Sequence, residues 1–168
     1  MRSLRAIVAV ALLAVAVYVG YRLFVRHSAP RFGDTIVVYF TKTDGETLGK
    51  WNVSLSPNAR DLASVAFYAT AQAVAGPPPD VTAVRFPSGT IARSARVSGS
   101  IATVDLGGAI RKAQDGSFGE SGEFKALVWT LTSLPGVKAV QVELDGARVA
   151  TLPGGHLELD EPLTRQSW

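Results

Sequence analysis

The sequence predicts an α+β protein in which two helices pack on a small mixed or antiparallel sheet to form a single compact domain, preceded by an N-terminal membrane helix. Three observations predict it. Residues 6–21 are uncharged and almost entirely apolar. Short runs rich in β-branched residues, such as residues 35–40, alternate with turn signals such as Asp145-Gly146. Two longer segments, ending near Gly76 and Gly136, carry apolar residues at helical spacing.

The N-terminal segment predicts a membrane anchor over residues 1–26. Residues 6–25 approach the roughly 20 apolar residues that a spanning helix needs, and Arg22 can extend its charge to the headgroups. We therefore expect an uncleaved, single-pass anchor. The alternative is a signal peptide cleaved after the small-residue motif 14–16, which would release a secreted domain. Arginines lie on both sides of the segment, so charge alone does not set its orientation.

Residues 27–34 have the composition of a linker, and the predicted domain follows over residues 35–168. Its first strand is the β-branched and aromatic run 35–40. Residues 51–55 alternate apolar and polar side chains, which predicts a second strand pairing back on the first.

The first helix of the domain is predicted to begin at Ser56-Pro57. Serine can accept hydrogen bonds from the free N–H groups of a first turn, and proline loses nothing at the first helical position. Gly76, followed by three prolines, ends the helix. Its apolar face comprises Leu62, Val65, Ala66, Ala69 and Ala73.

The middle of the chain predicts an antiparallel hairpin. Residues 90–97 and 100–106 are strand-like and flank Ser98-Gly99. Residues 81–86 are expected to be extended or irregular. The glycine-rich stretch 107–122 is expected to be mostly loop.

The second helix is predicted over residues 122–134, because Phe124, Leu127, Val128, Leu131 and Leu134 share one face. Residues 137–144 alternate with period two, which predicts a strand with one solvated face. Asp145-Gly146 then predicts a hairpin with a return strand over residues 147–152, and residues 153–168 are expected to be mostly irregular.

Charge and composition narrow the function. Of 17 basic residues, Arg2, Arg5, Arg22 and Arg26 flank or interrupt the apolar segment, which leaves 13 basic against 14 acidic residues elsewhere. A near-neutral domain without a basic cluster is not expected to bind nucleic acid. The chain has no cysteine, which excludes disulfides, thiolate zinc sites and a cysteine nucleophile.

The polar residues predict no catalytic, cofactor or metal site. His27 and His156 are the two histidines, and neither has a positioned partner in the sequence. Asp105 before Gly107-Gly108 is expected to serve turn chemistry rather than a metal. The acidic residues near the end lack calcium-loop spacing and are expected to be solvated, namely Glu158, Asp160 and Glu161.

Trp129 is the candidate interaction residue. At roughly 100° per residue it lies well away from Leu131 and the apolar face of the second helix, so it can either contact a partner or cover an edge of the core. Trp51 is expected to pack on a strand face, and Trp168 is expected to be exposed.

Several segments in order resemble the GerMN domain, named for a sporulation and germination protein. They are Val37-Val-Tyr-Phe40, Gly76-Pro77, Ala102-Thr-Val-Asp-Leu106, the helix end Thr130-Leu-Thr-Ser-Leu-Pro-Gly-Val137, Val140-Gln-Val-Glu-Leu-Asp-Gly146 and Pro162-Leu-Thr-Arg165. The resemblance covers about residues 35–165.

The resemblance implies an exported or membrane-attached envelope protein without enzyme activity or cofactor. It also implies a domain similar to the ring-building domains of secretion and sporulation assemblies. We therefore expect a membrane-tethered scaffold or protein-interaction module, with its domain outside the cytoplasm, that contacts another envelope protein. The alternative is a binding or sensor module for a cell-wall ligand, using the glycine-rich stretch 107–122.

Overall fold

The structure is a computed structural model that describes residues 12–21, 32–55, 59, 61–112, 116–153 and 155–168. The chain divides into two units, Met1–Arg31 and Phe32–Trp168. In the first unit, residues 12–21 form a helix. Across the described residues, no helix combines the length and the apolar character needed to cross a bilayer. The rest of the predicted anchor, residues 6–11 and 22–25, lies outside the described residues.

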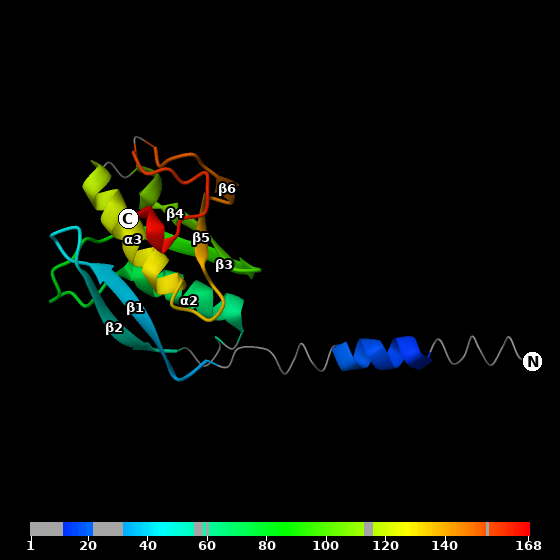
Figure 1. The fold of residues 1–168 in the computed structure, drawn as a ribbon. Helices are drawn as coiled ribbons and strands as arrows, with labels where there is room; N and C mark the ends of the chain where they lie inside the picture. Colours follow the sequence, from blue (N-terminus) through cyan, green and yellow to red (C-terminus); the bar gives the residue numbers. More distant parts are fainter. Residues whose placement is uncertain (1–11, 22–31, 56–58, 60, 113–115, 154) are drawn as a thin grey trace, which may run out of the picture. The chain divides into compact units, whose positions relative to one another are not determined.

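The second unit is an α+β domain, as the sequence predicts (Figure 1). Strands β1 and β2 come first, and helices α2 and α3 alternate with the later strands. The elements are β1 (Thr35–Thr41), β2 (Leu48–Ser54), α2 (Leu62–Ala75), β3 (Thr90–Ser98), β4 (Ile101–Gly108), the 3-10 turn η1 (Ala109–Lys112), α3 (Gly116–Leu131), β5 (Ala139–Leu144), β6 (Ala147–Arg148) and the 3-10 turn η2 (Arg165–Ser167).

The described strands form two sheets, so the expectation of a single sheet is wrong. β1 pairs with β2, while the second sheet has the order β3-β4-β5-β6. The reason lies at β1, where Tyr39 N donates to Thr130 Oγ1 of α3 at 2.9 Å. Helix α3 therefore lies against β1 at a position that another strand would otherwise occupy.

The four-stranded sheet is mixed. β3 and β4 form the predicted hairpin, while β4 and β5 run parallel and β5 pairs antiparallel with β6. A parallel pair needs a long crossover, and α3 supplies it between β4 and β5. The Asp145-Gly146 turn is confirmed, because both residues have positive φ values of 49° and 80°. The return strand is shorter than predicted, covering Ala147–Arg148 instead of residues 147–152.

Helix α2 begins later than the sequence suggests. It starts at Leu62, and Asp61 is its N-cap, with Oδ1 accepting from Ser64 N at 2.9 Å. Hydrogen bonds from Ser64 lower the pKa of the Asp61 carboxyl below its usual value. The predicted start at Ser56-Pro57 lies outside the described residues. The predicted end is confirmed, since Gly76 caps the helix with φ 79°.

Helix α3 begins earlier than predicted, and the stretch 107–122 is not mostly loop. It contains the end of β4, all of η1 and the first two turns of α3. Gly108 and Gly116 do have the positive φ values of turn glycines, but Gly122 lies within the helix, where its missing side chain permits close packing. A Cβ at Gly122 would lie 3.0 Å from Val84, and the carbonyl of Gly122 accepts from Thr41 Oγ1 at 2.8 Å.

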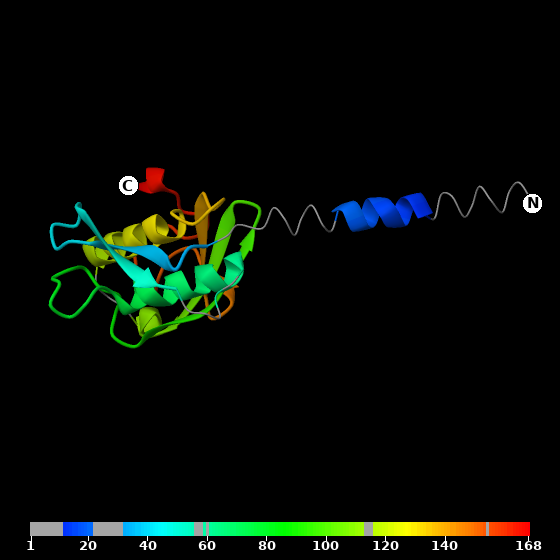
Figure 2. The ribbon, with the colours of Figure 1, turned by 90° about the horizontal axis from the view of Figure 1, so that it is seen from below.

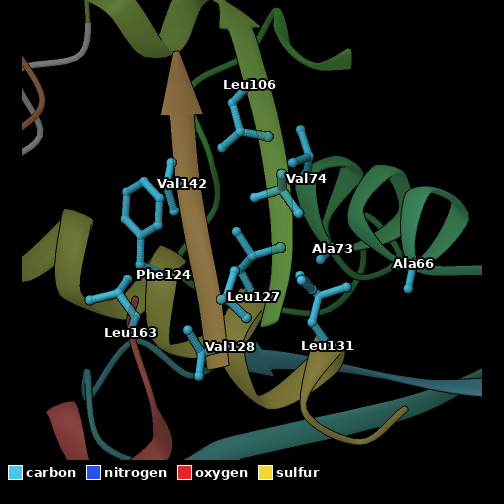
Figure 3. Close-up of a cluster of buried hydrophobic side chains, with 14 of the residues drawn as sticks. Ala66, Ala73, Val74, Leu106, Phe124, Leu127, Val128, Leu131, Val142 and Leu163 are labelled. Atoms are coloured by element: carbon cyan, nitrogen blue, oxygen red, sulfur yellow. The ribbon is translucent and has the colours of Figure 1, made fainter. Parts of the chain in front are cut away.

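The core lies between the helices and one face of the four-stranded sheet, and the β1–β2 hairpin packs against both helices (Figures 1 and 2). The predicted apolar face of α3 is confirmed. Figure 3 shows its side chains gathered near β4, β5 and α2. Phe124, Leu127, Val128 and Leu131 have no exposed surface, and neither do Val104 and Leu106 of β4.

Strand β5 is buried on both faces, so the expectation of a solvated face is wrong. The segment after β6 packs along it: Leu163 pairs with Val140, and Gln141 Nε2 donates to the carbonyl of Leu159 at 2.8 Å. Glu143 is covered by Arg96 of β3, which forms two hydrogen bonds with it. The Nε2 group of Gln141 and the carboxylate of Glu143 are therefore bonded to protein groups instead of water.

Candidate interaction surface

Trp129 lies on the half-exposed side of α3. The opposite side of this helix is buried in the core, and a second row of residues along the helix is less deeply buried. That row contains Phe118, Ser121, Lys125 and Trp129, spaced three or four residues apart. Phe118 is 55% exposed, whereas Ser121, Lys125 and Trp129 are half-buried.

Three side chains surround the Trp129 ring. The ring of Trp168 meets it edge to face, with centroids 5.9 Å apart and planes at 67°. Lys125 Nζ lies 5.9 Å from the Trp129 centroid, and Arg165 Cζ lies 5.6 Å from it. Both cations are within the range at which the face of an indole attracts positive charge. We call these four residues, Trp129, Trp168, Lys125 and Arg165, the tryptophan cluster.

Hydrogen bonds hold each outer member of the tryptophan cluster in place. Trp168 Nε1 donates to Ser121 Oγ at 2.8 Å, and Arg165 Nε donates to Thr132 Oγ1 at 2.8 Å. Lys125 Nζ donates to the carbonyl of Glu46 in the β1–β2 turn at 2.9 Å. The cluster therefore connects α3 to both the β1–β2 turn and the C-terminal segment.

A buried carboxylate fixes the chain upstream of the cluster. Glu120 of α3 is 1% exposed, and its Oε2 accepts from His156 N at 2.9 Å and from Leu157 N at 3.2 Å. The same carboxylate lies against Gly155, where an added Cβ would come within 2.7 Å of Oε1. Glu120 thus anchors the segment that leads to the tryptophan cluster.

Two cavities adjoin this region and share His156 and Leu157 in their linings. The first, of about 480 Å³, lies between Asp44–Glu46, the start of α3 at Phe118 and Ser121, and residues 156–157. The second, of about 510 Å³, includes the acidic residues Glu158, Asp160 and Glu161. Polar and charged groups thus line much of both cavities.

Asp44 at the first cavity is held ionised by its turn. Its Oδ1 accepts from Glu46 N at 2.9 Å and from Thr47 N at 2.8 Å. Hydrogen bonds from Thr47, followed by that from Glu46, lower the pKa of Asp44 from 3.8 to about 2. This carboxylate is therefore negative throughout the physiological range.

A separate ionic cluster lies on the four-stranded sheet. Arg93 contacts Asp105 at 3.2 Å and Asp145 at 3.0 Å, while Arg96 pairs with Glu143. The hydrogen bonds to Glu143 raise the pKa of Arg96 above its usual value. Arginine and carboxylate groups alternate here and largely compensate one another.

The expectation that Asp105 bonds to nearby backbone in its own turn is wrong, because its carboxylate bonds to a distant turn and to Arg93. Its Oδ1 accepts from Gly146 N at 2.8 Å, so it fixes the β5–β6 turn instead of its own. His156 is exposed, as expected, and His27 lies outside the described residues. Within the described ranges, no three His, Asp or Glu side chains converge in a way that could hold a metal ion.

The helical spacing of α3 points to Trp129 but not to the residues that surround it. Trp168 is half-buried against Trp129, so the expectation that it is exposed is wrong. The leucines that recur after β6 are the feature of the sequence from which this packing could have been predicted. Leu152, Leu159 and Leu163 are all buried, which places this segment on the domain and brings Arg165 and Trp168 to α3.

The family of the chain follows from a match over the folded domain. The Germane family, described as sporulation and spore germination, matches residues 37–150. The chain belongs to this family. The matched region includes α2, α3 and the four-stranded sheet, and it stops before the segment that carries Arg165 and Trp168. No curated protein sequence matches the chain.

Solved structures share the fold. The first GerMN domain of the sporulation protein GerM from Bacillus subtilis is 17% identical, with a TM-score of 0.61, covering 79% of this chain and 98% of that one. The tandem GerMN domains of the same protein are 20% identical, with a TM-score of 0.58, covering 79% of this chain and 46% of that one. This chain therefore spans about half of the tandem structure.

A third similar structure is a predicted lipoprotein from Clostridium perfringens. It is 19% identical, with a TM-score of 0.59, covering 82% of this chain and 93% of that one. At these identities the likeness establishes the fold and leaves the activity to be inferred from this chain's own residues.

Proposed function

We propose that this chain is a membrane-tethered, non-enzymatic interaction module of the cell envelope. The observation that carries the proposal is the tryptophan cluster. Tryptophan and arginine are enriched where proteins bind one another, and half-buried aromatic rings offer a large contact area at low entropic cost. Trp129 also lies on a helix whose other face is buried in the core, so a rigid element presents it.

The membrane tether is supported by the uncharged run over residues 6–21 and by the arginines around it. Family membership and the likeness to a predicted lipoprotein are consistent with a place at the envelope. We propose that residues 6–25 form an uncleaved single-pass anchor and that the domain lies outside the cytoplasm. Release of the domain by signal-peptide cleavage after residue 16 is the alternative.

Topology is tested in intact cells. N-terminal sequencing of the native protein should begin at or next to Met1. Protease added to spheroplasts should digest the domain, while a cytoplasmic marker protein stays intact. A native N-terminus near Val17 would refute the anchor, and a protected domain would refute the orientation.

The interaction role is tested by in-cell cross-linking with mass spectrometry. Photo-reactive residues placed at several exposed sites of the domain, including Phe118 and Lys138, should recover the same envelope proteins repeatedly. A chain with the reactive residue in the linker serves as the control for proximity alone. Recovery of the same proteins from both would contradict a specific interaction.

The second candidate function is a binding or sensor module for a cell-wall ligand. The first cavity favours it, because carboxylates, serine hydroxyls and the exposed Phe118 ring are typical of sites for polar ligands. Ser117, Phe118 and Ser121 belong to the glycine-rich stretch that the sequence suggested for this role. Saturable binding to purified cell-wall fragments would support this function, and the Phe118→Ala variant should weaken it.

A further inference from the structure

The tryptophan cluster carries two cationic side chains that form no direct ion pair with a carboxylate of the described residues. The paired cations among the described residues are Arg93, Arg96 and Arg111, which lie at the four-stranded sheet, and neither Lys125 nor Arg165 is among them. Lys125 donates to a backbone carbonyl and Arg165 to a threonine hydroxyl. These bonds orient the two cations without removing their charge.

We propose that the tryptophan cluster is a docking surface for an acidic, partly apolar peptide segment of a partner protein. This inference rests on the proposed interaction function and names the chemistry of the partner. Carboxylates of such a segment would accept from the remaining N–H groups of Lys125 and Arg165, and an apolar side chain would lie on the Trp129–Trp168 pair. Charge complementarity at a rim selects partners and accelerates encounter.

The geometry favours a narrow segment over a flat anionic membrane. Recognition of anionic lipid by simple charge takes clusters of about four to eight Lys or Arg residues, and this surface has two. The surrounding charge is also unfavourable for a lipid sheet. Asp44 and Glu46 line the first cavity, and Glu158, Asp160 and Glu161 line the second. A membrane lying across this side would meet these carboxylates, whereas a peptide can lie between them.

The carboxylates that line the two cavities also determine where the acidic residues of the docked segment can lie. Lys125 is bonded to the β1–β2 turn, next to the carboxylates of Asp44 and Glu46. An acidic side chain placed toward the first cavity would be repelled, while one placed between Lys125 and Arg165 would be attracted. The surface therefore selects a segment whose carboxylates are confined to the stretch over Trp129.

The test uses the full chain in an uncharged detergent, with the indole N–H signals followed by nuclear magnetic resonance. The chain has three tryptophans. Trp51 packs against Phe40 in the other sheet, with ring centroids 5.7 Å apart, and serves as an internal reference. The probe is a short peptide of glutamate and leucine, and the control peptide has glutamine at every glutamate position.

The glutamate peptide should shift the Trp129 and Trp168 signals and leave Trp51 unchanged, and added salt should weaken the effect. The double variant Lys125→Gln with Arg165→Gln should raise the Kd by about 2- to 30-fold, the range that two exposed ion pairs contribute. The matched control is Lys138→Gln with Arg148→Gln. This pair removes the same charge from exposed positions elsewhere on the domain and should leave the Kd unchanged.

Three outcomes would overturn the proposal. They are an equal response to the glutamine peptide, no response of Trp129 and Trp168 to the glutamate peptide, and a response to nanodiscs of phosphatidylglycerol in place of the peptide. In-cell cross-linking of the double variant separates this inference from the broader function. If envelope partners are still recovered at full yield, the chain is an interaction module that uses another surface. If the wild-type chain recovers none, the broader function itself fails.

Discussion

Replacing Leu131 with alanine is the sharpest test of how α3 divides between core and surface. Leu131 has no exposed area and lies among the buried side chains of α2 and α3 (Figure 3). Removing its branched end forfeits about 2–2.5 kcal/mol of transfer free energy, at roughly 0.8 kcal/mol for each buried carbon group. The cavity left in a layer between two helices and a sheet adds to this, so we expect a total of about 3–5 kcal/mol.

Trp129→Ala on the same helix should cost less, although it removes a larger side chain. The variant loses an edge-to-face pair worth about 0.5–1.5 kcal/mol and two partly exposed cation–π contacts of about 0.5–1 kcal/mol each. Neighbouring side chains and water can fill the space of a half-buried ring. We expect a total of about 1.5–3.5 kcal/mol, compared with about 3–5 kcal/mol for Leu131→Ala.

Both variants can be compared with wild type by urea unfolding followed by circular dichroism, and by thermal unfolding. A change of 1 kcal/mol lowers the Tm by roughly 2–8 °C for domains in this size range, so Leu131→Ala should produce a large shift. If Trp129→Ala destabilises the chain as much as Leu131→Ala, the tryptophan is part of the core. A loss below about 1 kcal/mol for Leu131→Ala would refute the packing of α3 on the sheet.

Three further outcomes follow from the described contacts. Gly108→Ala should destabilise the chain severely, since an added Cβ would lie 2.2 Å from the carbonyl oxygen of Gly89. The control Gly99→Ala has open space and should lose only about 1–2 kcal/mol, from its positive φ, in the same urea assay. Glu120→Ala should free residues 156–157, seen as faster amide hydrogen exchange at His156 and Leu157; unchanged exchange there would show that other contacts fix the segment. The Asp44 carboxyl should titrate near pH 2 by carbon-detected magnetic resonance. Its lowered pKa means that its contribution to stability is complete above pH 3.8 and is lost as the pH falls through about 2, so a midpoint near 3.8 would refute the turn geometry.

Local chemistry explains which elements could be predicted from the sequence. The hairpin around Gly99, the Asp145-Gly146 turn, the glycine cap of α2 and the apolar face of α3 each depend on neighbouring residues, and all are confirmed. The start of α3 could not be predicted in this way. Gly122 within its first two turns packs closely against Val84, which is distant in the sequence.

The candidate surface was predictable only in part, for a similar reason. The spacing of α3 separates Trp129 from the buried leucines, so the sequence predicts that it lies either at a partner contact or at an edge of the core. Its neighbours Arg165 and Trp168 lie more than thirty positions away, and the chain returns there only because Leu159 and Leu163 are buried beside β5. Likewise, the alternation of β5 predicts a solvated face, and only the returning segment explains why Gln141 is buried.

Residues 159–163 cover one edge of β5 but are synthesised after it, because the chain is made from its N-terminus. Strand β5 becomes available for folding before residues 159–163 do, and in that interval its edge at Val140 lacks a partner. An apolar strand with an open edge is a site for unwanted pairing with another chain. Residues 159–163 follow the region that the family matches, 37–150, and protection of β5 against misassembly depends on that later segment.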